Sequence, residues 1–140
     1  MVHTVMFTPG MPGYRERQDG LCQGRNQVQQ QFGVSEERRD GVSIVTPHGE
    51  VDVATAPALR EHLDAVIERD TGAVVADLSG VTFIDSTGLG VLIGAQRRCD
   101  EAGRDLRVVV SEPKIHKVFE ITGLTEHFTI CESLELAMRV

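Results

Sequence analysis

The stretch 74–94, VVADLSGVTFIDSTGLGVLIG, constrains what this chain can fold into more than any other segment. Two short apolar runs, 73–78 and 81–84, are separated by a turn. The first of these runs is typical of a strand that is buried on both faces of a sheet. After Asp85 the apolar spacing changes to that of a helix, which we expect from about residue 87 to residue 102. The stretch therefore predicts a strand, a turn, a second apolar run and a helix, which is the local pattern of an α/β domain.

Turn and helix signals divide the rest of the chain in the same way. The dipeptide Asp40-Gly41 is a strong hairpin signal, and the β-branched run after it predicts a strand over 42–46 that ends before Pro47. Further strands are expected over 28–35, 106–110 and 127–131, and further helices over 55–69, 113–122 and 134–139. Because strands then alternate with helices, we expect an α/β domain with a mixed, mostly parallel β-sheet of about five strands and four flanking helices.

The first 28 residues differ from the rest of the chain. They contain Pro9, Pro12 and several glycines, and they sustain neither the apolar period of a helix nor that of a strand. We therefore expect residues 1–28 to form a flexible N-terminal extension and residues 29–140 to form a single domain. Because 41% of the residues are hydrophobic and only 4% are aromatic, the core of this domain should be aliphatic.

The net charge of −7 limits the classes of partner. The extension carries three Arg, one Glu and one Asp, a charge of +1, so the domain carries −8. An acidic domain repels phosphate backbones, which argues against a nucleic-acid partner. The charge either serves solubility or attracts a basic protein. The sequence holds no apolar run of ~18 residues, so we expect no membrane span.

Neither a metal site nor a catalytic centre is expected. The five His and three Cys residues lack HExxH, HxxxH and CxxC spacing, so no metal ligand is predicted. Scattered cysteines, odd in number, indicate a reducing, cytoplasmic compartment. Cys99 and Cys131 are interpreted as buried thiols, with a redox pair as the alternative. Ser86 lacks a GxSxG context, and only His48 is a candidate to approach it as a base, so the chain is not expected to be an enzyme.

Glycines near the start of the helix over 87–102 have two interpretations. The segment 88–94 nearly matches GxGxxG, but Ile93 stands where the third glycine is required, so no nucleotide cofactor is predicted. Nucleotide binding is kept as a minor alternative. Gly90 and Gly94 lie inside the helix, where each costs ~1 kcal/mol relative to Ala. We therefore expect either the sheet or a partner to approach this helix face closely.

The tetrapeptide Asp85-Ser86-Thr87-Gly88 forms the entrance to this helix. Either Asp85 or Ser86 can cap the N-terminus, a contribution of ~1 kcal/mol, but the segment holds more capping side chains than one cap needs. The free N–H groups and the positive end of the helix dipole would tolerate a phosphate on Ser86. Such a phosphate would add roughly two negative charges beside Asp85. Ser86 therefore suits a switch that changes a surface without unfolding the protein.

Three motifs carry a family resemblance, namely GEVD at 49–52, DLSGVTFIDSTGLGVL at 77–92 and ITGL at 121–124. Together they resemble the STAS domain of bacterial anti-sigma factor antagonists. The likeness spans about residues 29–140 and leaves the N-terminal extension outside. The DSTGLG core within its DLSGVTFI setting is highly specific to this family. The resemblance implies a small α/β domain, in agreement with the pattern of strands and helices.

The resemblance also implies a regulator of stress-response transcription that works by partner switching. Members of the family bind an anti-sigma factor, which is also a serine kinase, and so free a sigma factor. The kinase would phosphorylate Ser86, and a metal-dependent serine phosphatase would remove the phosphate. Asp52 and Asp85 are expected to flank the docking surface, with Thr87, Gly88 and Gly90 lining the helix entrance. The alternative is a non-switched STAS scaffold subunit of a stress-signalling complex or a lipid-transport system. A weak homodimer is the expected self-association.

Overall fold

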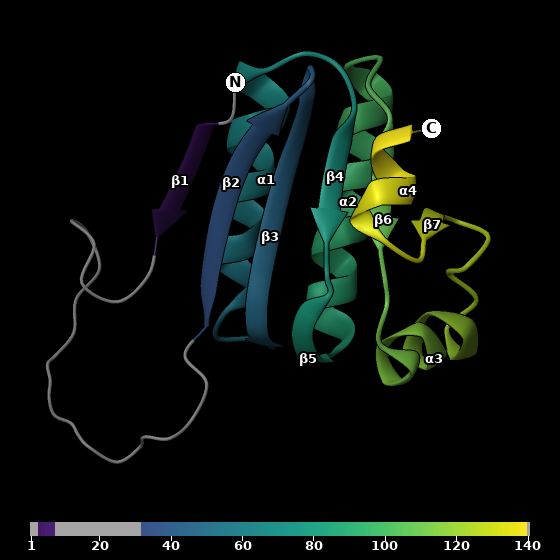
Figure 1. Ribbon diagram of the computed structural model, residues 1–140. Coiled ribbons are helices and arrows are strands. Elements are labelled where there is room, and N and C mark those ends of the chain that lie inside the picture. Colours follow the sequence, from purple (N-terminus) through teal and green to yellow (C-terminus); the bar gives the residue numbers. More distant parts are fainter. Residues whose placement is uncertain (1–2, 8–31, 140) are drawn as a thin grey trace, which may run out of the picture.

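The computed structural model describes residues 3–7 and 32–139, in which the strands form one seven-stranded sheet (Figure 1). In chain order the elements are β1 (His3–Phe7), β2 (Gly33–Arg39), β3 (Val42–Val51), α1 (Ala56–Arg69), β4 (Val74–Asp77), β5 (Gly80–Ile84), α2 (Ser86–Glu101), β6 (Leu106–Val109), α3 (Pro113–Ile121), β7 (Thr129–Cys131) and α4 (Leu134–Arg139). The strand order is β1-β2-β3-β4-β6-β7, and β5 pairs with the second half of β3. The strands β1, β2 and β3 are antiparallel neighbours, whereas every pairing from β3 onwards is parallel.

This arrangement confirms the predicted α/β class, the mixed, mostly parallel sheet and the four helices. The sheet holds more strands than the expected five, because β5 is a separate strand and His3–Phe7 adds β1. Residues 3–7 pair with β2 from His3 opposite Arg38 to Phe7 opposite Val34. The rest of the predicted flexible extension, residues 1–2 and 8–28, lies outside the described residues, so flexibility there stays a prediction.

The prediction that the strand after the hairpin ends before Pro47 is wrong. The Asp40-Gly41 turn is present, with positive φ angles of 54° and 80°, but β3 continues to Val51. Residues 43–45 of β3 pair with β4, and residues 48–51 pair with β5. Pro47 lies between these two parallel ladders, so its missing N–H costs neither of them a hydrogen bond. Two successive parallel partners therefore carry the strand through a residue that would ordinarily end it.

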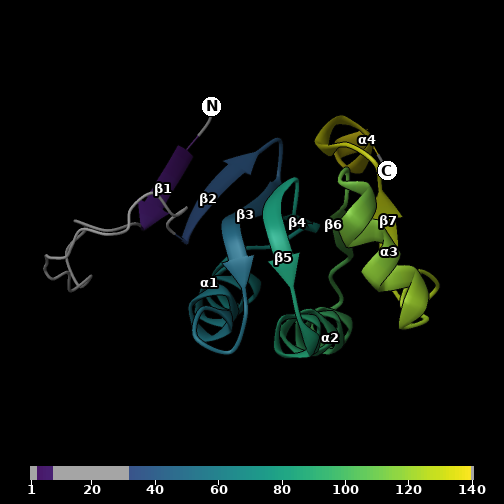
Figure 2. The same cartoon turned by 90° about the horizontal axis from the view of Figure 1, so that it is seen from below.

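The helices cover the two faces of the sheet unequally (Figure 2). Helices α1 and α2 lie side by side on one face, over an aliphatic core that includes the fully buried Leu59, Leu63 and Leu92. Helix α4 lies on the opposite face, over a smaller cluster that includes Ile44 and Val109. The predicted aliphatic core is thus confirmed. No helix among the described residues is long and apolar enough to cross a membrane.

Candidate functional site

The carboxyl ends of β3 and β5 meet at one edge of the sheet, where α1 and α2 both begin (Figure 1). Val51 pairs with Ile84, and the backbone N–H of Asp85 donates to the carbonyl oxygen of Val51 at 3.2 Å. Asp52 and Asp85, which follow this pair, are therefore brought together by tertiary pairing although they are far apart in the sequence. This is the edge at which an open α/β sheet ordinarily binds its ligands.

The Asp52 carboxylate organises the turn from β3 into α1. Its Oδ1 accepts hydrogen bonds from the backbone N–H groups of Ala54 and Thr55, at 3.0 and 3.1 Å. Thr55 occupies the N-cap position of α1, but its hydroxyl makes no capping bond and instead donates to the carbonyl oxygen of Glu50 at 2.8 Å. Asp52 is half-buried and firmly oriented, so it presents a fixed negative group at this edge.

Asp85, not Ser86, is the N-cap of α2. Its backbone is extended, and its Oδ1 accepts from the N–H groups of Thr87 at 2.9 Å and Gly88 at 3.2 Å. Ser86 is the first helical residue, exposed to solvent, and its hydroxyl forms no hydrogen bond with the described residues. Of the two capping candidates, the structure therefore shows Asp85 as the cap. The Ser86 hydroxyl is left free at the positive end of a helix dipole.

The close approach expected at Gly90 and Gly94 occurs at Gly88 instead. A Cβ added to Gly88 would lie 2.7 Å from Val51 Cγ1 and 2.8 Å from Ile84 Cγ1, so only glycine lets α2 start against the ends of β3 and β5. A Cβ on Gly90 would meet no atom within 4 Å, and one on Gly94 would meet only the guanidinium of Arg98, 3.4 Å away. Gly90 thus lies on the free surface, whereas Gly88 positions the helix.

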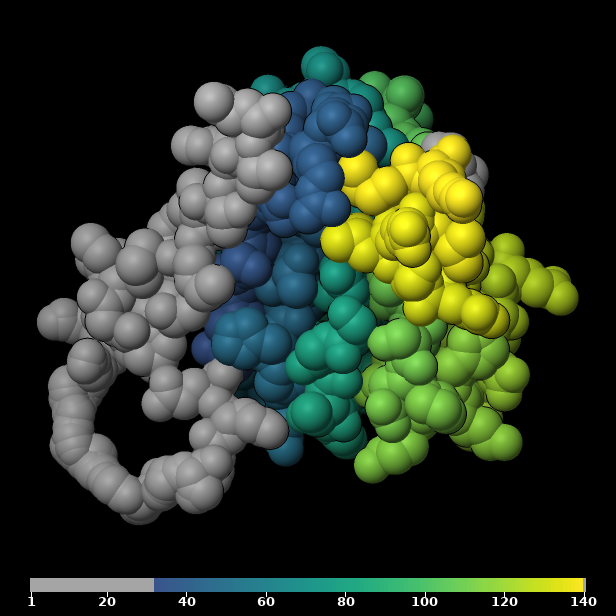
Figure 3. All heavy atoms as spheres, in the orientation of Figure 1, coloured from purple at the N-terminus to yellow at the C-terminus, as the bar shows by residue number. Residues whose placement is uncertain are grey.

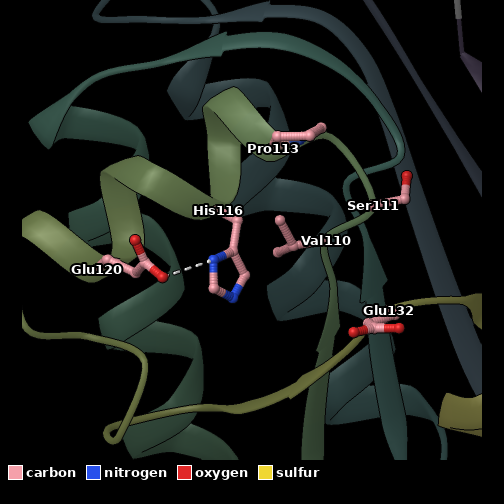
Figure 4. Close-up of a pocket in the computed structure, with 6 residues that line it drawn as sticks. All are labelled: Val110, Ser111, Pro113, His116, Glu120 and Glu132. Atoms are coloured by element: carbon pink, nitrogen blue, oxygen red, sulfur yellow. Dashed lines mark ion pairs between the residues drawn. The ribbon is translucent and has the colours of Figure 1, made fainter.

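Two hollows lie near this region, and only one contains a predicted site residue. A groove of about 390 Å³ runs between the first turns of α1 and α2, and Thr87 lines it together with Arg60 and Asp64. A second hollow, of about 520 Å³, lies beside α3, where His116 and Glu120 form an ion pair at 3.3 Å (Figure 4). None of the predicted site residues lines this second hollow. The predicted site is therefore an edge with one shallow groove rather than an enclosed pocket.

The thiols offer little reactivity. Cys99 and Cys131 are free and buried, as interpreted from the sequence, so they are not joined in a disulfide. Burial raises the pKa of the Cys99 thiol to about 11 and also raises the pKa of Cys131. Since the thiolate is the reactive form, burial opposes redox chemistry at both residues.

The described residues contain no group of three or more His, Cys, Asp or Glu side chains that could hold a metal ion.

Sequence reasoning missed two exposed apolar side chains at this edge. Val53, next to Asp52, is 71% exposed, and Phe83, two residues before Asp85, is 47% exposed. In the sequence, Phe83 belongs to the short apolar run 81–84. Nothing in that run indicates which of its side chains face outward. The exposure of Phe83 depends on how β5 pairs with β3, and no local signal could have shown it.

Comparison with known proteins identifies the family. The STAS domain model matches residues 34–137. The anti-sigma-B factor antagonist of Staphylococcus aureus strain COL is 33% identical over 88 residues, which are 63% of this chain and 82% of that protein. A crystal structure of an anti-sigma factor antagonist from Mycobacterium paratuberculosis has a TM-score of 0.69 at 33% identity, over 77% of this chain and 92% of that chain.

A more distant structure shares the fold. The Bacillus cell fate determinant SpoIIAA in its phosphorylated form has a TM-score of 0.58 at 21% identity, over 77% of this chain and 97% of that chain. This chain and the two solved structures thus share one fold. Because the family model matches residues 34–137, well over half of the chain, the chain belongs to the STAS domain family.

Proposed function

We propose that this protein is a cytoplasmic anti-sigma factor antagonist that is switched by phosphorylation of Ser86. In its unphosphorylated form it binds an anti-sigma factor with serine kinase activity and so frees a sigma factor. The observation that carries the proposal is the free, exposed hydroxyl of Ser86 at the first position of α2, with the capping bonds made by Asp85. The two relatives at 33% identity, both named anti-sigma factor antagonists, support the same function.

The position of Ser86 explains how a phosphate could act without disturbing the fold. The N-terminus of α2 carries the positive end of the helix dipole, so it favours an added anion although Asp85 already accepts from the N–H groups of Thr87 and Gly88. Because Ser86 is exposed, its phosphate would not displace any packed group. The phosphate would add roughly two negative charges between the carboxylates of Asp52 and Asp85 and the partner, which blocks docking by charge and by bulk.

The predicted docking residues divide into two groups. Asp52, Asp85, Ser86, Thr87 and Gly90 are exposed or half-buried at the edge, so a partner can reach them. Gly88 is buried against the ends of β3 and β5, so a partner does not contact it. Its role is to position α2, which carries the exposed docking residues. In this proposal the chain is a substrate of a serine kinase and of a serine phosphatase, and it is not itself an enzyme. Neither nucleic acid nor a membrane is a partner, and self-association is no more than a weak homodimer.

The test compares two variants of Ser86 for binding to a purified anti-sigma factor kinase from the same organism. Ser86→Ala removes the phosphoacceptor and keeps the surface neutral, so we expect it to bind like the wild type. Ser86→Glu places a carboxylate at the same position, and we expect it to lose most of its affinity in a titration calorimetry experiment. Equal affinity of both variants would overturn the switch and favour the non-switched scaffold.

Mass spectrometry after incubation with the kinase and ATP locates the phosphate. We expect one phosphate on Ser86 in the wild type and none in Ser86→Ala. The neighbouring Thr87 is also exposed, so it is the natural internal control. A phosphate found on Thr87 instead would refute the assignment of Ser86.

A further inference from the structure

β5 contains an irregularity immediately before the phosphoacceptor segment. Gly49 of β3 pairs with Val81, but the next residue of β3, Glu50, pairs with Phe83. Two residues of β5 are therefore used where β3 uses one, and Thr82 is the extra residue. Such a bulge changes the direction in which the following side chains point.

The bulge exchanges the faces of Phe83 and Ile84. In a regular strand, side chains two residues apart share a face, so Phe83 would lie with Val81 in the core and Ile84 would face outward. In the structure Val81 is 2% and Ile84 4% exposed, whereas Phe83 is 47% exposed. The fold thus buries Ile84 and leaves an aromatic ring, whose burial would ordinarily stabilise the fold, half exposed.

Phe83 lies on the face of the sheet away from α1 and α2, where it stays 47% exposed although α3 contacts β5. Helices α1 and α2 pack on the other face, and α4 packs against β4, β6 and β7. Atoms in the colours of β3 and β5 reach the surface below the yellow α4 and beside the green atoms of α3 (Figure 3). Glu50, opposite Phe83 in the pairing, is exposed as well.

We infer that Phe83 is the apolar anchor by which the anti-sigma factor docks, with Val53 as a second contact. This inference rests on the proposed function, since it extends the surface around Ser86 onto the neighbouring sheet face. Phe83 is three residues from Ser86, and Val53 follows Asp52, so both apolar side chains are continuous with the proposed docking edge.

Charge around the two apolar side chains specifies the partner further. Glu50 pairs with Phe83, Asp52 precedes Val53 and Asp85 follows Phe83 by two residues, so the apolar side chains have acidic neighbours, and the edge would become still more negative when Ser86 is phosphorylated. The matching surface of the anti-sigma factor is therefore an apolar pocket for an aromatic ring, with basic side chains at its rim. Buried aromatic anchors with a polar rim are the usual hot spots of such interfaces.

The test measures the affinity of the full-length chain for an anti-sigma factor kinase from the same organism that binds the wild type. Calorimetry is run with ADP in place of ATP, so that Ser86 stays unphosphorylated. We expect Phe83→Ser to weaken binding by roughly tenfold or more, and Val53→Ser to weaken it less. The matched control is Leu136→Ser on α4, since Leu136 is 44% exposed, and it should bind within about twofold of the wild type.

Two further measurements keep the outcomes distinct. If Phe83→Ser lowers the melting temperature, Phe83→Leu keeps an apolar side chain and should still lose several-fold in affinity because it lacks the ring. Affinities of the Phe83 variants equal to that of Leu136→Ser would overturn the inference and leave the proposed function intact. The proposed function fails separately, when Ser86→Glu binds as tightly as the wild type.

Discussion

At the entrance of α2, neighbouring side chains have separate tasks. The Asp85 carboxylate satisfies the N–H groups of Thr87 and Gly88, so the helix starts without any help from Ser86. A hydroxyl that carries no structural hydrogen bond can be modified at little cost in stability. The division between Asp85 and Ser86 is therefore what makes a phosphoacceptor compatible with a fixed helix start.

The two glycines of this entrance should respond oppositely to substitution. Gly88→Ala places a methyl group against Val51 and Ile84, and we expect it to lower the free energy of unfolding by about 1–3 kcal/mol. Gly90→Ala meets open space inside a helix, and we expect it to raise that free energy by up to ~1 kcal/mol. Urea denaturation monitored by circular dichroism measures both. A similar loss in the two variants would show that the Gly88 contact is not the determining one.

Among the elements, α1 is held by a side chain from a distant part of the chain. The Arg104 guanidinium, buried at the end of α2, donates to the carbonyl oxygens of Val66 at 2.7 Å and Ile67 at 3.0 Å, in the last turn of α1. It also donates to the carbonyl oxygen of Gly72 at 2.6 Å. The Val66 carbonyl also accepts from the backbone N–H of Asp70 at 3.0 Å, and Gly72 lies beyond the helix, so Arg104 adds side-chain donors to the end of α1 and to the loop that follows it.

Replacement of Arg104 should therefore destabilise the protein even when the charge is kept. Arg104→Lys offers one compact ammonium in place of a planar fork, and it leaves at least one buried carbonyl unpaired. We expect a loss of about 1–3 kcal/mol in the free energy of unfolding, measured by urea denaturation. Arg97→Lys, at an exposed position on α2, is the matched control and should change little. Equal stability of the two variants would contradict the capping role of Arg104.

In the molecule as a whole, the N-terminal strand β1 and the proposed docking edge are built on different strands of the sheet. β1 pairs with β2 at one side of the sheet, whereas the docking edge is built by β3, β5, α1 and α2. The pairing with β1 covers backbone groups of β2 that would otherwise be exposed along an edge strand. The first residues therefore protect a sheet edge without taking part in the proposed site.

Deletion of residues 1–28 tests this separation. We expect the shortened domain to bind the anti-sigma factor kinase within about twofold of the full chain when measured at low protein concentration, because the contacts of a distant edge are independent. At high concentration the uncovered edge of β2 should promote self-association, which light scattering detects. A loss of binding of tenfold or more at low concentration would instead assign the N-terminal residues a part in docking.

Local signals alone were sufficient for the class of fold and for the prediction of Ser86 as a candidate switch residue. The alternation of apolar runs with helical periods predicted the α/β class, because each of these patterns is set by neighbours in the sequence. The Asp40-Gly41 turn and the Asp85-Ser86-Thr87-Gly88 helix entrance are equally local, and the structure places both at their predicted positions. Asp85 was one of two capping candidates, since sequence spacing does not distinguish adjacent caps.

Strand pairing decided what the sequence could not. The continuation of β3 through Pro47 required two successive parallel partners, and the meeting of Asp52 with Asp85 required Val51 to pair with Ile84. The outward turn of Phe83 required a bulge in β5, which is defined only by the pairing of β5 with β3. Each of these features depends on register between segments distant in the chain, and register is a property of the assembled sheet. The sequence by itself determined the fold class and the position of Ser86 at a helix entrance, and the tertiary structure decided which surface surrounds Ser86.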